Sequence, residues 1–311
     1  MSRWLTLCLA LCSCGALAQT PDFDQAAVKV SKVSGNIHVL MSATGCNIAV
    51  SVGEDGVLLV DASYRQMLDK NLAALRQITD LPVRYVVNTH YHGDHTTGNE
   101  GFMDAVIIAH SNALRRLRSG GVGGNFATFR FEYSPLPNPA LPELTFEREL
   151  NLPFNGEEVR ILHHPRSHTD GDAIVYFPKS KVVHMGDQFT AYGFPDIDIA
   201  GGGSTAGWIA ALDDIMQILP KDVKVIPGHG PLSTMNDVKR LRNMLAETLD
   251  VVKAARAAGK TLAQMKQEKI LDPWKQWAGF FTADVYLDML YNDLAGTHEW
   301  AQPQRTAEPV Q

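Results

Sequence analysis

The sequence predicts an α/β protein in which two β-sheets pack together and helices cover the outside. Short apolar runs bounded by turn residues, such as Ser34-Gly35-Asn36, indicate strands, and amphipathic stretches indicate helices. This alternation of strands and helices occurs twice, which is typical of two sheets that share a core. The chain has 311 residues, 45% of them hydrophobic and 20% charged, which is ordinary globular composition.

The first half predicts an antiparallel meander that is followed by alternating strands and helices. Turn residues separate the first four strands from one another. We expect strands at Val28–Val33, Ile37–Ala43, Asn47–Val52, Val57–Asp61, Val83–Val87 and Val106–Ala109, and helices at Tyr64–Ile78 and Asn112–Arg118.

The second half repeats this pattern and then becomes helical. We expect strands at Leu144–Leu150, Glu158–His163, Asp172–Phe177, Lys181–His184 and Val223–Ile226, a helix at Thr205–Leu219, and helices from Asn236 onward. The predicted division is therefore a main domain over residues 19–235 and a helical C-terminal extension over residues 236–311, packed on the same domain. The aromatic cluster of Trp274, Trp277, Phe280 and Phe281 in the extension is expected to serve packing.

Two glycine-rich segments interrupt the regular elements. Ser119–Leu144 also contains four prolines and several aromatic residues, and Ala191–Gly203 precedes a helix. Long segments without periodicity are commonly functional or disordered, and aromatic residues argue against disorder. We expect the first segment to be a flap that faces a substrate.

The N-terminus has the features of a signal peptide over residues 1–18. Arg3 precedes an apolar run, Leu5–Leu17, and Ala16-Leu17-Ala18 matches a small-x-small cleavage site. Cleavage would place Gln19 at the mature N-terminus and the protein in the periplasm or outside the cell, without a membrane anchor. A lipid-modified Cys14 is the competing interpretation.

Charge and cysteine content exclude some classes of protein. The formal net charge of −6 offers no basic surface for nucleic acid. Cys46 alone remains after cleavage, so the mature chain forms no internal disulfide. A small buried hydrophobe is a better interpretation of Cys46 than a catalytic thiol.

A candidate metal-binding loop follows the strand Val83–Val87. It contains His90, His92, Asp94 and His95, and neutral imidazole is the commonest metal ligand in proteins. His90 and His92 are two residues apart, so in an extended segment they point the same way. The turn after Gly93 would direct Asp94 and His95 to a second, adjacent position, and a helix is expected to begin at Gly98.

Three more candidate ligands lie at later junctions between strands and loops. His168 precedes a strand, whereas Asp187 and His229 each follow one. A rigid sheet can hold ligands at such junctions while one side of the metal stays open. His90, His92 and His168 would form one site; Asp94, His95 and His229 would form a second; and Asp187 has two oxygens with which to bridge them.

This pattern, His-x-His-x-Asp-His followed by His168, Asp187 and His229, resembles the metallo-β-lactamase-fold hydrolases. The resemblance covers roughly residues 37–230 and implies an αββα four-layer sandwich with two Zn²⁺ ions at one edge. The spacing from His168 to Asp187 is similar to that of the β-lactamase subclass that uses a cysteine ligand. Here Asp187 occupies the cysteine position, as in glyoxalase II-like thioesterases and lactonases, and Thr190 replaces the lysine that holds the substrate carboxylate.

The resemblance implies an exported hydrolase in which a hydroxide that bridges two zinc ions attacks a carbonyl group. Asp94 would bind the second metal and orient the nucleophile, and iron or manganese is an alternative ion in that site. We expect a small-molecule substrate, and a β-lactam or a related cyclic amide or ester is favoured. A lactonase or thioesterase remains open, as does a zinc-binding protein without catalytic activity. Asp61 is expected either to support a ligand histidine or to cap the local structure.

Overall fold

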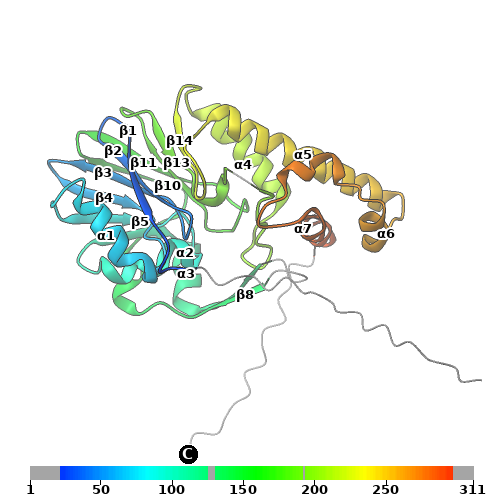
Figure 1. The fold of residues 1–311 in the computed structure, drawn as a ribbon, viewed down its shortest axis with the longest axis horizontal. Coiled ribbons are helices and arrows are strands. Elements are labelled where there is room, and N and C mark those ends of the chain that lie inside the picture. The colour runs from blue at the N-terminus through cyan, green and yellow to red at the C-terminus, as the bar shows by residue number, and fades with distance from the viewer. Residues whose placement is uncertain (1–21, 125–129, 192, 297–311) are drawn as a thin grey trace, which may run out of the picture.

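The computed structural model describes residues 22–124, 130–191 and 193–296, and its two sheets confirm the predicted αββα sandwich (Figure 1). The first sheet has the order β1-β2-β3-β4-β5-β6-β9, and the second has the order β10-β11-β12-β13-β14-β15. The strands of the first sheet are β1 Val28–Ser34, β2 Ile37–Ser42, β3 Ile48–Gly53, β4 Gly56–Val60, β5 Val83–Val87, β6 Val106–His110 and β9 Leu144–Phe146. The strands of the second are β10 Glu149–Phe154, β11 Glu157–His163, β12 Ala173–Phe177, β13 Val182–His184, β14 Lys224–Ile226 and β15 Ser233–Thr234.

Helices cover the outer face of each sheet. Figure 1 shows α1 beside the first sheet, and α4 and α5 beside the second. The helices are α1 Leu68–Arg76, α2 Gly93–Thr96, α3 Ser111–Ser119, α4 Thr205–Ile218, α5 Met235–Ala257, α6 Leu262–Gln267 and α7 Ala283–Ala295. Short 3₁₀ turns are η1 Arg65–Met67, η2 Thr97–Gly101, η3 Asn138–Ala140, η4 Gly186–Gln188 and η5 Asp272–Trp277. A separate hairpin consists of β7 Gly121–Gly124 and β8 Arg130–Tyr133.

Strand β4 illustrates why the layers form. All five of its residues are buried, and successive side chains point to opposite faces of the sheet. Leu58 and Val60 face the second sheet, where they pack in one cluster with Ile161 and Val175. Leu59 belongs instead to the cluster beneath α1. A continuous apolar run of this kind is expected of a strand covered on both sides.

The C-terminal helices pack on the outer face of the second sheet. Val183 of β13, Trp208 of α4, Leu245 of α5 and Tyr286 of α7 belong to one buried cluster. The aromatic ring of Tyr286 is fully buried, and its hydroxyl lies 3.1 Å from Thr248 Oγ1. The extension therefore shares its core with the sheet.

Two expected elements differ from the structure. The single strand predicted at Leu144–Leu150 is two strands, β9 and β10, which belong to different sheets. The chain changes sheets between Phe146 and Glu149, and apolar periodicity cannot detect such a crossing. The helix after the histidine loop begins at Gly93, where the sequence had indicated Gly98.

Part of the chain lies outside the described ranges. The predicted signal peptide at residues 1–18, the cleavage site and Cys14 all fall among these residues. Within the described ranges, no helix combines the length and the apolar character needed to span a bilayer.

Asn47 connects the first sheet to the loop that follows β14. Its side-chain amide donates to the carbonyl oxygens of Pro227 and Gly230 at 2.9 and 2.8 Å, and its backbone N–H donates to Gly228 O at 2.8 Å. We expect Asn47→Ala to lower the free energy of unfolding by about 2–3 kcal/mol, because two largely buried acceptors lose their donor. Asn36→Ala, which removes one contact to Asn155 O at 3.2 Å, should cost about 1 kcal/mol or less. Urea unfolding of the two variants would measure the difference, and equal losses would contradict the role of Asn47.

Candidate metal centre

The predicted ligands meet at one edge of the two sheets. His90 and His92 follow β5, Asp94 and His95 lie on α2, His168 precedes β12, Asp187 lies in η4 after β13, and His229 follows β14. Ligand atoms of the first group, His90, His92, His168 and Asp187, lie within 4.8 Å of one another, as do those of the second group, Asp94, His95 and His229. The structure therefore brings together every residue proposed from the sequence.

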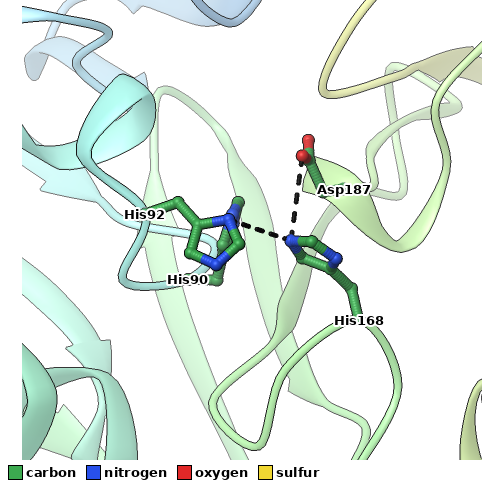
Figure 2. A group of neighbouring side chains, drawn as sticks. All are labelled: His90, His92, His168 and Asp187. Atoms are coloured by element: carbon green, nitrogen blue, oxygen red, sulfur yellow. Dashed lines mark hydrogen bonds and ion pairs between the residues drawn. The ribbon is translucent and has the colours of Figure 1, made fainter. Parts of the chain in front are cut away.

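The first group contains three imidazoles, which converge from two loops, and the Asp187 carboxylate (Figure 2). His92 Nδ1 lies 3.1 Å from His168 Nε2, and His168 Nε2 lies 3.8 Å from Asp187 Oδ2. His90 Nε2 is buried and has no hydrogen-bond partner. Burial, together with the neighbouring His95 and His92, holds the pKa of His90 well below its usual value. An uncharged imidazole with an unused, buried nitrogen is the form that binds a metal ion.

The second group lies beside Asp187. His229 Nε2 is 3.1 Å from Asp94 Oδ2, and His95 Nε2 is 3.4 Å from His229 Nε2. Asp187 reaches both groups, since its Oδ1 lies 3.2 Å from His95 Nε2 and its Oδ2 lies 3.4 Å from His229 Nε2. The carboxylate thus occupies the position from which it can bridge two ions.

The charges of the two acidic side chains depend on these histidines. Burial raises the pKa of Asp187, but the fields of His229 and His95 outweigh it and hold that pKa well below its usual value. Burial likewise opposes ionisation of Asp94, yet His95 and His229 lower its pKa to about 2. For His229, burial lowers the pKa and the Asp187 carboxylate more than reverses this effect. Both carboxylates are therefore ionised at neutral pH, where they can bind cations.

Asp61 fixes the orientation of two candidate ligands from the end of β4. Its side chain accepts hydrogen bonds from His95 Nδ1 at 2.8 Å, from Thr89 N at 2.7 Å and from Thr89 Oγ1 at 2.8 Å. Because the Thr89 hydroxyl donates to Asp61, it accepts from His90 Nδ1 at 3.0 Å. Both His90 and His95 consequently present Nε2 to the cluster. The sequence left two roles open for Asp61, and the geometry supports the first of them: Asp61 orients a candidate ligand histidine.

Asp198 plays the same part for His92, and the sequence analysis did not find it. Its Oδ2 accepts from His92 Nε2 at 2.9 Å and from the Tyr91 hydroxyl. Its Oδ1 accepts from the backbone N–H groups of Gly124 and Gly201, each at 2.7 Å. The available sequence signal is an acidic residue between two apolar ones, Ile197-Asp198-Ile199, because a buried carboxylate needs several donors.

His168 is held by backbone rather than by a carboxylate. Its Nδ1 donates to the carbonyl oxygen of Asp196 at 2.9 Å, which leaves Nε2 facing the cluster. Burial raises the pKa of the Asp196 side chain to about 6, and its Oδ1 is buried without a partner. The 194–198 segment therefore orients two histidines of the first group.

The other histidines of the described ranges lie outside the two groups of ligand atoms. The ring of His110 stacks on that of His163, with centroids 3.7 Å apart, and His164 Nε2 lies 3.0 Å from Asp214 Oδ2. His184 Nε2 donates to Asn47 O at 3.0 Å. His38 lies within β2, and burial lowers its pKa.

Cys46 is buried beside the second group. Its sulfur, an oxygen of Asp61 and a nitrogen of His95 lie within 4.8 Å of one another. Burial raises the pKa of the thiol, so it stays protonated at neutral pH. This agrees with the interpretation of Cys46 as a small buried hydrophobe rather than a nucleophile.

A cavity of about 1040 Å³ opens above the metal-ligand candidates. His92, Asp94, Asp187 and His229 contribute to its floor. Its walls include residues 131–137 of the predicted flap and residues 194–196 of the second glycine-rich segment. The candidate ligands are therefore accessible to a small molecule, and both segments singled out in the sequence face it.

The aromatic cluster in the C-terminal extension divides between two roles. Trp274 and Trp277 pack against the buried core, as predicted. Phe281 also belongs to the buried core, although it contributes to the cavity lining as well. Phe280 lines the cavity and is 70% exposed. The expectation that all four residues serve packing was therefore wrong for Phe280, because the sequence does not show that η5 ends beside the cavity.

A family comparison identifies this arrangement. The model of the metallo-β-lactamase superfamily matches residues 42–229, which include all seven candidate ligands. The chain belongs to the metallo-β-lactamase superfamily. Its histidine and aspartate clusters are consistent with the metal sites typical of this fold, and its activity and substrate are separate questions.

Known members of the superfamily are similar to this chain over different lengths. A metallo-β-lactamase type 2 of Elizabethkingia meningoseptica is 21% identical over 263 residues, which cover 81% of this chain and 98% of that protein. A linear primary-alkylsulfatase of Pseudomonas sp. is 25% identical over 232 residues, or 63% of this chain. The chain spans only 43% of that alkylsulfatase.

The fold is also similar to that of a solved alkylsulfatase. The stereoselective inverting sec-alkylsulfatase Pisa1 from Pseudomonas sp. superposes with a TM-score of 0.65 at 16% identity. The match covers 91% of this chain and 52% of Pisa1. At this identity the likeness establishes the fold alone.

Replacement of Asp198 by asparagine tests how His92 is oriented. The Oδ1 of the new asparagine would still accept from the N–H groups of Gly124 and Gly201, so its NH₂ group would face His92 Nε2. A donor at that place favours the His92 tautomer that is protonated on Nδ1. That tautomer cannot ligate through Nδ1, so we expect zinc affinity to fall about 10- to 100-fold. Competition with a chromophoric chelator measures the change.

Asp214→Asn is the matched control, because Asp214 pairs with His164, which lies outside the metal-ligand candidates. This variant should bind zinc like the wild type. Unchanged affinity in Asp198→Asn would show that His92 does not depend on Asp198.

Proposed function

We propose that this metallo-β-lactamase-superfamily protein is an exported dinuclear zinc hydrolase that opens a carbonyl substrate. A β-lactam or a related cyclic amide or ester is the favoured substrate class. The observation that carries the proposal is the position of Asp187 between two groups of ligand atoms on the floor of an accessible cavity. A lactone or a thioester is the alternative substrate of the same site.

The residues fit two metal ions. His90, His92 and His168 offer neutral nitrogen ligands, and the partnerless Nε2 of His90 would gain a partner there. Asp94, His95 and His229 would hold the second ion, with Asp187 shared between the two. This mixed nitrogen and oxygen set suits Zn²⁺, and the carboxylates of the second site also suit iron or manganese.

Bound metal ions would supply a water ionised near neutral pH and polarisation of the carbonyl oxygen. The protein's own contribution is to place the reacting groups. Asp94 and Asp187 face the cavity with their carboxylates ionised, so each can accept a hydrogen bond from the attacking water and orient it. Asp61 and Asp198 keep the histidines in the ligating orientation, which prevents reorganisation during the reaction.

The cavity lining bears on how a substrate is recognised. Thr190 lines the cavity at the position where the cysteine-ligand β-lactamases resembled by this chain carry a lysine. Among the described lining residues, Arg65 is the only lysine or arginine, and it pairs with Glu100 at 3.0 Å. Recognition of a substrate carboxylate would therefore differ from that subclass, which keeps lactones and thioesters in the comparison.

We predict about two metal ions per chain, because two complete groups of ligands are present. Elemental analysis of protein purified without chelators would measure this ratio. A stable value near one, unchanged after zinc is added, would contradict the dinuclear arrangement.

A substrate panel tests the reaction. We expect metal-loaded protein to hydrolyse at least one of a β-lactam, an acyl lactone, a thioester and an alkyl sulfate, the last included because of the alkylsulfatase relatives. Chelation should abolish turnover, and Asp94→Asn should reduce kcat about 10²-fold, because the attacking water loses the charged group that orients it. Asp214→Asn serves as the control. No turnover by protein that contains two zinc ions would favour the alternative of a zinc-binding protein without catalytic activity.

A further inference from the structure

The walls of the cavity are aromatic, in contrast to its acidic and histidine-rich floor. Six phenylalanine and tyrosine side chains from four parts of the chain line it: Tyr64, Phe131, Tyr133, Phe194, Phe280 and Phe281. A solvent-accessible apolar surface beside polar groups is typical of a binding site.

One aromatic wall begins at the candidate metal centre. The ring of Phe131 meets that of His92 edge to face, with centroids 4.9 Å apart and an interplanar angle of 86°. The ring centroid of Tyr133 lies 6.2 Å from that of Phe131 and 4.9 Å from that of Tyr91, the residue that follows His90. A group attached to a substrate bound at the first group of ligands would therefore meet strand β8 immediately.

The C-terminal extension contributes another part of the wall. Phe280 and Phe281 pack edge to face with centroids 4.8 Å apart, and Phe280 is the most exposed large hydrophobic residue in the described ranges. The backbone beside them lies close to the 194–198 segment, because a Cβ on Gly279 would be 3.1 Å from Gly193 Cα. Phe194 in turn stacks on Tyr286 of α7, with centroids 4.5 Å apart. These contacts hold the phenylalanine pair at a fixed place relative to the loop that orients His168.

The charges of the lining argue against an ionic group at this wall. Arg65 is already paired with Glu100. Two further charged residues line the cavity besides the candidate metal ligands, and both are acidic: Glu132 and Asp196. A neutral, apolar group would gain contacts with the rings and leave no charge unpaired.

We propose that the aromatic wall formed by β8 and the Phe280–Phe281 pair is a subsite for a neutral alkyl or aryl substituent of the substrate. The proposal rests on the proposed function in that the substituent is attached to the group hydrolysed at the metal centre. Phe280 and Phe281 are thus specificity-determining residues supplied by the C-terminal extension.

Binding of linear carboxylates tests the subsite without any need for turnover. Butanoate, hexanoate and octanoate share a carboxylate that can approach the metal ions and differ only in the length of the alkyl chain. We expect calorimetric affinity for the zinc-loaded protein to rise about threefold for each added methylene that becomes buried. In chelated protein all affinities should fall, but the increment for each methylene should persist.

Phe280→Ala should leave butanoate affinity unchanged and reduce the gain from butanoate to octanoate about tenfold. Phe280→Leu should restore much of that gain, because an apolar side chain is again present. Met103→Ala is the matched control, since Met103 is an exposed apolar residue that does not line the cavity. Because Phe280 is exposed, its variants should fold like the wild type, and thermal melting would check this.

The outcomes separate the two proposals. The subsite would be overturned if wild-type affinity did not depend on chain length. It would also be overturned if Phe280→Ala gained as much affinity from butanoate to octanoate as the wild type does. Hydrolysis of a panel substrate together with that result would leave the proposed function intact. A chain-length gain that depends on Phe280, in a protein that hydrolyses nothing, would support the subsite and reject the hydrolase.

Discussion

The structure depends on holding several ionisable side chains close together in a buried place. Asp187 lies within 3.8 Å of three histidines, and such crowding is tolerated only where charges and hydrogen bonds compensate one another. The backbone must also approach closely: a Cβ on Gly228 would lie 1.9 Å from Asp187 Oδ1, and Gly186 has φ +51° beside Thr89. Glycine at these two positions is required by the space around the carboxylate.

Hydrogen bonds from two buried carboxylates connect the candidate ligands to the rest of the fold. Asp61 connects the end of β4 to His90 and His95, while Asp198 connects the 194–198 segment and strand β7 to His92. Each carboxylate therefore fixes a tautomer and also joins segments that are far apart in the sequence. The orientation of the candidate ligands and the packing of the two sheets are consequently coupled.

Strand periodicity predicted two packed sheets, and the spacing of His90 to His95 predicted that these side chains lie together, because both are local properties. His168, Asp187 and His229 were added from their positions at strand ends and from the family resemblance. The sequence did not predict features that depend on contacts between residues far apart in the chain. Asp198 is 106 residues from His92, and nothing in the neighbourhood of either residue indicates the pairing. The crossing from β9 to β10 and the position of Phe280 at the cavity depend on packing in the same way.

The two parts of the cavity are determined by different constraints. The floor is built from strand ends and is held by buried carboxylates, so small changes there would disturb the charge balance of the whole cluster. The walls come from β8, the 194–198 segment and the C-terminal extension, where Phe280 is exposed. A fixed reaction centre can thus serve different substrates as its walls change, which is why membership of the superfamily does not determine the substrate. The proposed subsite assigns substrate choice in this chain to the aromatic wall and the Arg65–Glu100 pair more than to the candidate metal ligands.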